Sequence, residues 1–515
     1  MKKFSFIALL PILILTSCSS AGRTSGKKIN VSKVAVESGI IAGKTNPEGN
    51  VSIFSGIPYA APPVGELRWK APMPPLKWEG VRQCVTPPPS AMQSKPAPFM
   101  MWSKEFMAPE EPLSEDCLFL NIWTPAKSSA EKLPVMVWIH GGAFTGGSGT
   151  VPLYDGEEMA KKGVVFITIN YRLGVFGFLT HPELTAESPL KTSGNYGILD
   201  QIEALRWISR NIEAFGGDPG NVTIAGQSAG SFSVNALMIS PLAKGLFHRA
   251  IGQSGGMFSG GPGLVYDLKS AESAGVSFAG QFSDSSIAGL RTLPAEDLMK
   301  VRSRSGVTTD NIVVPPATET FREVRQNDVP LLAGWNADDG VSGVATLSVQ
   351  EYKSNAEKRY GDMAPDYLRI FPANSEEEIQ KWMKQTTVLS FGWQNYTWVK
   401  TQTETGNNKA YLYYFTRVPP GEPNYGAFHS AEFGYALNTL KLWDRPFTDT
   451  DRELADLMSS YWVNFAATGD PNGEGLPHWP AFDPASPQVI EFGNEVKSTP
   501  LPFREQLEFF DRLNR

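Results

Sequence analysis

Short, nearly continuous apolar runs that alternate with helical patterns constrain the fold of this chain more than any other feature. Runs without polar residues at alternate positions are typical of strands that are buried on both faces. Helices between such strands cover the sheet and return the chain for the next parallel strand. The sequence therefore predicts an α/β fold with a large, mostly parallel central sheet covered by helices on both faces. The runs span residues 118–123, 135–139, 164–169, 222–225 and 329–333.

Local signals predict further elements at both ends of the chain. Segments 34–41 and 51–57 are separated by a turn-rich stretch, which predicts a starting pair of strands. Apolar residues recur at helical spacing over 198–212, which predicts an amphipathic helix. Thr450 and Glu453 match a capping box that would open a late helix.

The beginning of the chain has the pattern of a secretory signal. Lys2 and Lys3 give a basic start, and residues 4–15 form an apolar run that is too short to span a bilayer. The string Leu15-Thr16-Ser17-Cys18 resembles the bacterial lipobox, in which the peptide is cut before the cysteine. We therefore expect a lipoprotein signal peptide over residues 1–17.

Cleavage there would leave Cys18 to carry a lipid anchor. Residues 18–32 are polar and rich in Ser, Gly and Lys, which predicts a tether. Ser19 is not the aspartate associated with inner-membrane retention, so an exported lipoprotein of the outer membrane or periplasmic face is expected. The alternative is an ordinary signal peptide with a chance cysteine. Residues 33–515 contain no repeat and no second linker, and we expect them to form one catalytic domain with long loop insertions.

Net charge indicates which partners are unfavourable, and cysteine content indicates whether a disulfide is expected. The net charge of −7 argues against nucleic acid, whose phosphates require a basic surface. With Cys18 assigned to lipid, Cys84 and Cys117 remain as an even pair in an exported protein. Export to an oxidising compartment favours a disulfide between them. The alternative is two unrelated reduced thiols.

The strongest catalytic signal is a strand, a sharp turn and a helix around Ser228. The turn is Gly226-Gln227-Ser228-Ala229-Gly230, whose glycines permit a strained backbone that exposes the serine hydroxyl. The N-terminus of the following helix would favour negative charge beside it. Ser254 lies in a matching string, but the segment after it is rich in glycine and cannot form a helix. Ser228 is therefore the predicted nucleophile.

A serine nucleophile needs a general base, which is normally a histidine. His429 follows the predicted strand 410–416 and a Pro/Gly loop, which is the placement expected of such a base. The other histidines lie in a glycine-rich turn, a loop before a proline, a helix end and a Pro-rich stretch. By elimination and chain order His429 is the candidate. The four other histidines are His140, His181, His248 and His478.

The third catalytic residue should be a carboxylate between the serine and the histidine in the chain. Asp339 follows the apolar run 329–333 and precedes a glycine turn, and a strand end is where a site residue is expected in such a sheet. Asp338 is the competitor, and the pattern alone does not separate the two.

A donor site for an oxyanion is predicted where a strand enters the small-residue turn of residues 138–144. Small residues allow backbone N–H groups to approach a substrate oxygen, and the N–H of Ala229 would complete the set. Each such donor is typically worth about 10²–10³ in rate. The alternative is an ordinary Gly-Gly turn.

Several longer strings together resemble the type-B carboxylesterases, the family that includes the cholinesterases and the para-nitrobenzyl esterases. The resemblance extends from about residue 36 nearly to the end of the chain. It implies the α/β-hydrolase fold with an active-site gorge, and a serine carboxylesterase that needs no cofactor or metal. The strings are residues 54–60, 114–121, 215–219 and 464–471.

The resemblance also implies roles for individual residues. It assigns Gly142, Ala143 and Ala229 as the oxyanion donors, Asp339 as the acid and His429 as the base. The family usually has glutamate at the position of Asp339, and aspartate is one methylene shorter. Either the loop from Gly334 brings its backbone closer to His429, or Asp338 or a water molecule assists.

For the two remaining cysteines the resemblance implies a disulfide between Cys84 and Cys117 that helps to wall the gorge. The segment between them is rich in Pro, Met and aromatic residues, which indicates an apolar lip and hydrophobic or aromatic esters. Its apolar residues are Phe99, Met100, Met101, Trp102 and Phe106.

These observations predict a carboxylic-ester hydrolase that works through an acyl-enzyme and a Ser-Asp-His triad. Its expected partner is a small-molecule ester, with membrane contact only through the lipid. The alternatives are an amidase or peptidase with the same triad, and a non-catalytic binding module on the same fold. The identity of the ester and the oligomeric state are left open.

Overall fold

The computed structural model describes residue 1 and residues 28–258, 263–341, 343 and 346–514. The predicted cleavage site, Cys18 and most of the tether lie outside these residues. No helix in the described ranges is long and apolar enough to cross a membrane.

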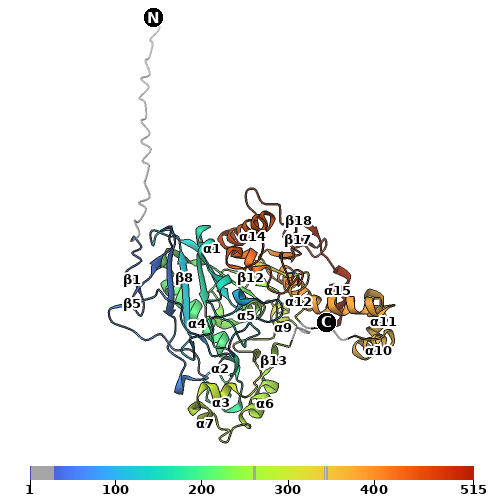
Figure 1. Cartoon of the computed structure of the whole chain (residues 1–515), viewed down its shortest axis with the longest axis horizontal. Helices are drawn as coiled ribbons and strands as arrows, with labels where there is room; N and C mark the ends of the chain where they lie inside the picture. The colour runs from blue at the N-terminus through green and yellow to red at the C-terminus, as the bar shows by residue number, and fades with distance from the viewer. Residues whose placement is uncertain (2–27, 259–262, 342, 344–345, 515) are drawn as a thin grey trace.

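An eleven-stranded sheet forms the centre of the molecule (Figure 1). The neighbouring strands β10, β9, β11, β12, β15, β16 and β17 run parallel to one another. Antiparallel pairs extend the sheet at both edges. This arrangement confirms the predicted α/β fold. In spatial order the strands are β18 (Val496–Pro500), β17 (Gln488–Phe492), β16 (Ala410–Phe415), β15 (Leu331–Asn336), β12 (Arg249–Gln253), β11 (Gly217–Gln227), β9 (Leu133–Ile139), β10 (Val165–Ile169), β8 (Phe119–Thr124), β4 (Ser52–Pro58) and β3 (Lys44–Thr45).

The prediction of one strand over residues 34–41 was wrong. The segment forms two short antiparallel strands, β1 (Val34–Val36) and β2 (Gly39–Ala42), in a separate sheet with β5 (Val81–Gln83). Gly39 adopts a φ of 152°, and an added Cβ there would lie 2.5 Å from the Trp78 indole nitrogen. The chain turns at Glu37 and Ser38, directly before Gly39, and β4 pairs with β3 and β8 instead.

Helices cover both faces of the sheet. The predicted helix at 198–212 is present as α4 (Tyr196–Asn211). The predicted late helix is α14 (Asp449–Thr468), but its capping box is formed by Thr448 and Asp451. Asp451 also accepts hydrogen bonds from Arg417 and Tyr435, and these tertiary contacts anchor the helix start two residues before the predicted box.

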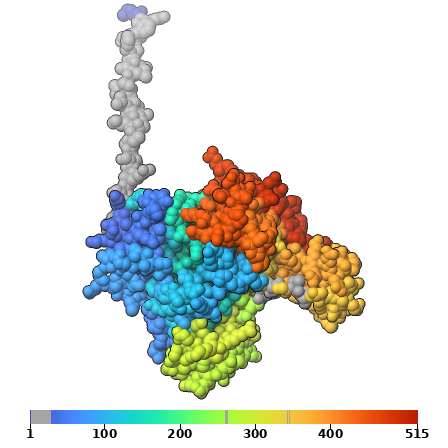
Figure 2. Space-filling view, in the orientation of Figure 1, coloured from blue at the N-terminus to red at the C-terminus, as the bar shows by residue number. Residues whose placement is uncertain are grey.

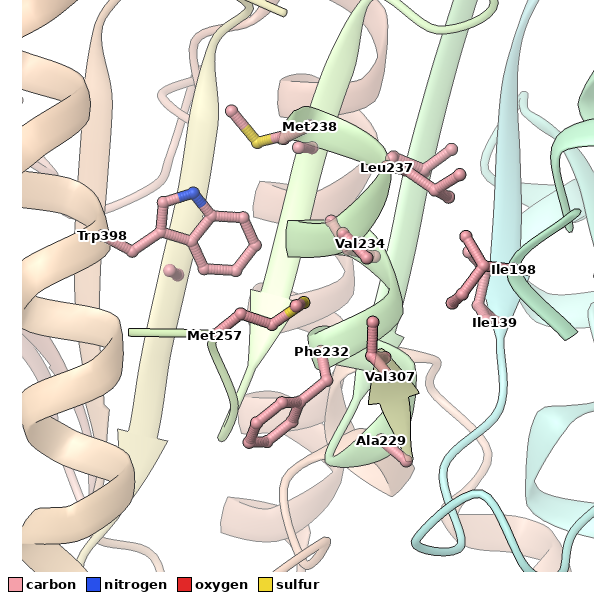
Figure 3. Close-up of a cluster of buried hydrophobic side chains, with 14 of the residues drawn as sticks. Ile139, Ile198, Ala229, Phe232, Val234, Leu237, Met238, Met257, Val307 and Trp398 are labelled. Atoms are coloured by element: carbon pink, nitrogen blue, oxygen red, sulfur yellow. The ribbon is translucent and has the colours of Figure 1, made fainter. Parts of the chain in front are cut away.

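Helix α5 (Ala229–Ile239) is buried along its entire length. In Figure 3, Leu237 extends toward Ile198 of α4, while Met238 extends toward Trp398. Close packing at one end of α5 requires glycine, because a Cβ at Gly230 would lie 2.0 Å from the carbonyl oxygen of Ile139. The helix is therefore held directly against β9.

The remaining helices and small sheets lie in connections between the strands of the main sheet, except α15 (Arg504–Leu513), which follows the last strand. Helices α10 (Val349–Tyr360), α11 (Ala364–Ile370) and α12 (Glu376–Thr405) form the longest helical connection, between β15 and β16. Of these, α10 and α11 project from one edge of the molecule (Figure 1). The elements are β6 (Ser90–Ala91) with β7 (Leu113–Ser114), β13 (Val265–Asp267) with β14 (Val307–Thr309), α1 (Glu157–Lys161), α2 (Gly174–Phe178), α3 (Pro182–Glu187), α6 (Leu268–Ala279), α7 (Ile287–Thr292), α8 (Ala295–Met299), α9 (Ala317–Arg322), α10 (Val349–Tyr360), α11 (Ala364–Ile370), α12 (Glu376–Thr405), α13 (Phe433–Ala436) and α15 (Arg504–Leu513).

Contacts with the body of the fold begin before the expected domain start at residue 33. Lys28 forms an antiparallel bridge with Ser128, and the Ile29 N–H donates to the carbonyl of Lys127 at 2.9 Å. Ile29 also packs against the main core. The last residues of the predicted tether therefore belong to the folded domain.

The predicted Cys84–Cys117 disulfide is absent, because both cysteines are free and buried. Each thiol has its own surroundings: Cys84 Sγ lies 3.9 Å from the carbonyl oxygen of Gly56, whereas Cys117 lines a small cavity with Arg172. Burial raises the pKa of Cys84 to about 11 and also raises the pKa of Cys117, so both are neutral thiols near pH 7.

Candidate active site

Ser228 lies at the turn between β11 and α5. Its backbone has a φ of 56° and a ψ of −125°, a left-handed conformation that non-glycine residues rarely adopt. The turn is tight, because a Cβ added at Gly226 would lie 2.5 Å from the carbonyl carbon of Gly230. Such strain clusters at functional sites, and here the serine is held at the carboxyl end of a central strand.

His429 and Asp339 meet at the same edge of the sheet. His429 Nδ1 lies 2.6 Å from Asp339 Oδ1, and both side chains are buried. The second carboxylate oxygen, Oδ2, accepts from the Ser254 hydroxyl at 2.7 Å and from the Asn336 backbone N–H at 3.0 Å. These two donors fix the orientation of the carboxylate. The aspartate thus reaches the histidine despite its short side chain.

Asp338 has a different set of partners and does not contact His429. Its Oδ2 accepts from the Ala427 N–H at 2.9 Å, and its Oδ1 pairs with Lys384 at 3.0 Å. Its own N–H donates to the Ala427 carbonyl at 3.0 Å. Asp338 therefore fixes the loop that carries His429. The geometry separates the two aspartates that the sequence pattern left open.

Gln227 occupies the face of His429 that a nucleophile would use. With the Nδ1 proton donated to Asp339, Nε2 is an acceptor, and the Gln227 amide nitrogen lies 3.2 Å from it. Among the described residues, Ser228 Oγ makes no hydrogen bond. Catalytic hydrogen bonds often form only when substrate is present. In this tautomer the Gln227 amide donates to the same nitrogen that Ser228 would use as its base.

The predicted oxyanion turn lies beside the serine. A Cβ added at Gly141 would be 3.2 Å from Ser228 Cβ, so the turn and the nucleophile are in contact. Gly142 and Ala143 both have positive φ angles and are exposed. Ala229 is the first residue of α5, where backbone N–H groups have no intrahelical acceptor. The turn that carries Gly142 and Ala143 therefore begins beside Ser228, the residue directly before Ala229.

Glu432 is a second buried carboxyl group behind the site, and sequence reasoning missed it. It accepts hydrogen bonds from Gln253 Nε2 at 3.0 Å and from Asn336 Nδ2. Burial, and then the nearby charge of Asp339, raise the pKa of Glu432 to about 7. Asn336 also donates its backbone N–H to Asp339, so one residue connects the two carboxyl groups.

The other histidines have structural partners. His181 accepts from the Glu183 N–H at the start of α3, and His248 accepts from the Val222 N–H. His140 stacks on Tyr171, and burial lowers the pKa of His140 to about 4, so this ring is neutral at physiological pH. His478 is exposed. Of the five histidines, only His429 contacts Asp339.

Aromatic side chains enclose the His429 ring on two sides. Phe391 of α12 stacks on it with a centroid distance of 4.7 Å, and Trp102 meets it edge-on at 6.3 Å. The Trp102 N–H donates to Ser430 Oγ at 3.2 Å. Phe99 packs on Trp102 and is more than half exposed. Part of the predicted apolar lip therefore reaches the candidate base, whereas Met101 and Phe106 are buried in the core.

No cluster of side chains suited to a metal ion occurs within the described parts of the chain. The arrangement itself brings together a serine, an imidazole, a carboxylate and backbone donors. These are the groups needed for acyl transfer.

Comparisons with known proteins agree with this geometry. A family model described as "Carboxylesterase family" matches residues 30–510. A fumonisin B1 esterase of Sphingopyxis macrogoltabida is 34% identical over 476 residues, which cover 88% of this chain and 85% of that protein. The para-nitrobenzyl esterase of Bacillus subtilis is 34% identical over 492 residues, covering 90% and 95%. A solved para-nitrobenzyl (PNB) esterase structure superposes with a TM-score of 0.79 at 31% identity, covering 93% of this chain and 99% of that one.

Replacing each aspartate separately should distinguish their roles. We expect Asp339→Asn to lower kcat for 4-nitrophenyl butyrate by about 10³–10⁴, because the imidazole loses its orienting carboxylate. Asp338→Asn should leave kcat within about tenfold, since it alters only the loop support. Thermal unfolding of both variants controls for misfolding. Loss of turnover in the Asp338 variant alone would contradict the assignment.

The raised pKa of Glu432 predicts a pH-dependent stability. The folded state holds this proton more tightly than the unfolded chain, so stability from Glu432 is present at low pH and is lost as pH rises toward 7 and above. Glu432→Gln removes the titration, and its unfolding free energy should therefore fall less between pH 5 and pH 8. Between pH 5 and pH 8 the unfolding free energy of the wild type should fall by about 1–3 kcal/mol more than that of the variant. Urea unfolding at each pH measures it, and parallel curves would contradict the role of Glu432.

Proposed function

Because this chain belongs to the carboxylesterase family and is a carboxylic-ester hydrolase, we propose that it cleaves esters through an acyl-enzyme on Ser228. The observation that carries this proposal is the 2.6 Å contact between His429 and Asp339 beside a serine held in a left-handed turn. The first step is a proton transfer from Ser228 to His429 Nε2 as the serine oxygen attacks the ester carbonyl. Asp339 fixes the imidazole tautomer and stabilises the imidazolium that forms.

The tetrahedral oxyanion then lies against the backbone N–H groups of Gly142, Ala143 and Ala229. His429 returns its proton to the leaving alcohol, which departs as the carbonyl of the acyl-enzyme re-forms. Water attacks this second ester with His429 again as the base, and the carboxylic acid leaves as Ser228 is regenerated. Activity should therefore fall on acidification, because a protonated imidazole cannot accept the serine proton.

The substrate is proposed as a class rather than a compound. Two relatives are a fumonisin B1 esterase and a para-nitrobenzyl esterase. We propose a substrate for this chain with the same type of bond, a carboxylic ester. Phe99 and Trp102 beside His429 support an apolar or aromatic group near the reacting bond.

We also propose that the protein is exported and anchored through lipid on Cys18, as the lipobox-like string indicates. Mass spectrometry of the N-terminal peptide from the membrane fraction should find a lipidated cysteine at position 18. Cys18→Ala should release the protein from that fraction with its esterase activity intact. An unmodified N-terminus upstream of residue 18 would contradict the anchor.

A covalent probe tests the nucleophile directly. A fluorophosphonate should label the wild-type chain at one residue, Ser228, and Ser228→Ala should lose both the label and at least about 10³-fold in kcat. Ser254→Ala is the comparison variant, because Ser254 lies in the same five-residue pattern. It should still be labelled at Ser228, at a reduced rate because Asp339 loses one hydrogen-bond donor. Labelling that persists in the Ser228 variant would disprove the proposal. Amide analogues of the same acyl group, assayed alongside, decide between esterase and amidase.

A further inference from the structure

A cavity between α10, α11 and α12 has no role in the proposed mechanism. Its volume is about 560 Å³, within the range of small-molecule sites. In Figure 2 the helices α10 and α11 form a distinct orange lobe at the edge of the molecule. The part of α12 that faces this lobe precedes Phe391, and residues of all three helices line the cavity.

The inner end of this cavity adjoins the candidate active site. Phe391 lines the cavity and also stacks on the His429 ring. Thr387, one turn earlier on α12, is a second shared wall, because a Cβ added at Gly340 would lie 2.6 Å from its hydroxyl. Gly340 directly follows Asp339. A group bound at this end of the cavity would therefore lie one aromatic ring away from His429.

Aromatic rings give the cavity a rigid, mainly apolar body. Tyr360 and Tyr367 stack with centroids 4.4 Å apart, and the Tyr352 hydroxyl donates to the Phe371 carbonyl at 3.1 Å. All three tyrosines are buried, and Met383 adds an apolar side chain. Such walls suit an alkyl or aryl spacer.

One positively charged side chain lies at the outer, exposed end of the cavity. Arg359 is the only charged side chain among the described residues that line the cavity, and it is exposed. Its guanidinium lies 5.5 Å from the Tyr360 ring centroid, and no described acidic residue pairs with it. Asn355, one helical turn earlier, also lines the cavity without a hydrogen-bond partner in the described structure. Guanidinium and amide donors together match a carboxylate, which can remain partly hydrated at this entrance.

We propose that this cavity binds a free carboxylate on the ester substrate, with Arg359 as its counter-charge and the tyrosines around the connecting spacer. The substrate class is then an ester that retains a second, unesterified carboxyl group on either its acyl or its alcohol side. This inference rests on the proposed esterase function and specifies the substrate of the same site.

Two pairs of esters distinguish the two sides. The acyl pair is 4-nitrophenyl hydrogen adipate and its neutral methyl ester, with the pimelate and suberate homologues to vary the spacer. The alcohol pair is 4-acetoxybenzoate and its methyl ester. In at least one pair we expect kcat/KM for the anionic ester to exceed that of its neutral partner by about threefold to tenfold at low salt, with the preference reduced at high salt.

Variants on α10 identify the cation. Arg359→Gln should abolish the preference by raising KM for the anionic ester, while kcat/KM for the neutral ester stays within about twofold. Arg359→Lys should keep part of the preference. Lys358→Gln is the matched control, because it removes a neighbouring positive charge outside the cavity lining and should change neither ester.

Binding without turnover separates this inference from the esterase proposal. Calorimetry with monomethyl adipate and with 4-acetoxybenzoate on the Ser228→Ala variant should detect binding of at least one of them, and Arg359→Gln added to that variant should weaken it. If the wild type hydrolyses no ester, only the esterase proposal is contradicted. Calorimetry would still show whether the cavity binds a carboxylate. Preference for the neutral ester in both pairs, or equal loss for both members in Arg359→Gln, would overturn the carboxylate site.

Discussion

The close contact between α5 and β9 is the constraint on which the candidate site depends. Only glycine at position 230 permits it, since a larger residue would meet the Ile139 carbonyl. The contact forces the chain to leave β11 through a left-handed turn and to begin a helix at once. The serine, the first N–H groups of α5 and the turn after β9 are thereby brought together by main-chain geometry before any catalytic side chain is considered.

Side chains from distant parts of the chain then complete the arrangement. Asp339 comes from the end of β15 and His429 from the loop after β16, and each depends on polar groups that are themselves buried. Ser254, Asn336 and Glu432 form this supporting layer. Removing one of these groups would leave its buried partner without a hydrogen bond, which makes the layer sensitive to single substitutions.

The sequence pattern predicted the parts that depend on local chemistry. The turn at Ser228 is encoded by its own glycines, and the order of serine, acid and histidine follows from the order of the strands. The supporting residues could not be found in this way: Glu432 gains its role by burial beside Asp339, and Ser254 by the pairing of β12 with β15. The repeated string at residues 252–256 was the one available signal, and it suggested a rival nucleophile rather than a partner of the acid.

The errors have the same origin. The segment predicted as one strand over 34–41 turns at Glu37 and Ser38, with Trp78 packed against Gly39. The box at Thr450 is replaced by one at Thr448, whose partner Asp451 also binds Arg417 and Tyr435. For the cysteines, an even count and an exported location indicated a disulfide, whereas the structure gives each thiol its own buried surroundings. In each instance the outcome involves segments that are distant in the sequence and that a local pattern does not contain.

The contact between Gln227 and His429 bears on how the proposed site would be activated. While the Gln227 amide donates to Nε2, the lone pair that would take the serine proton is engaged in a hydrogen bond. A shift of this one side chain would therefore couple the arrival of a substrate to the pairing of Ser228 with His429.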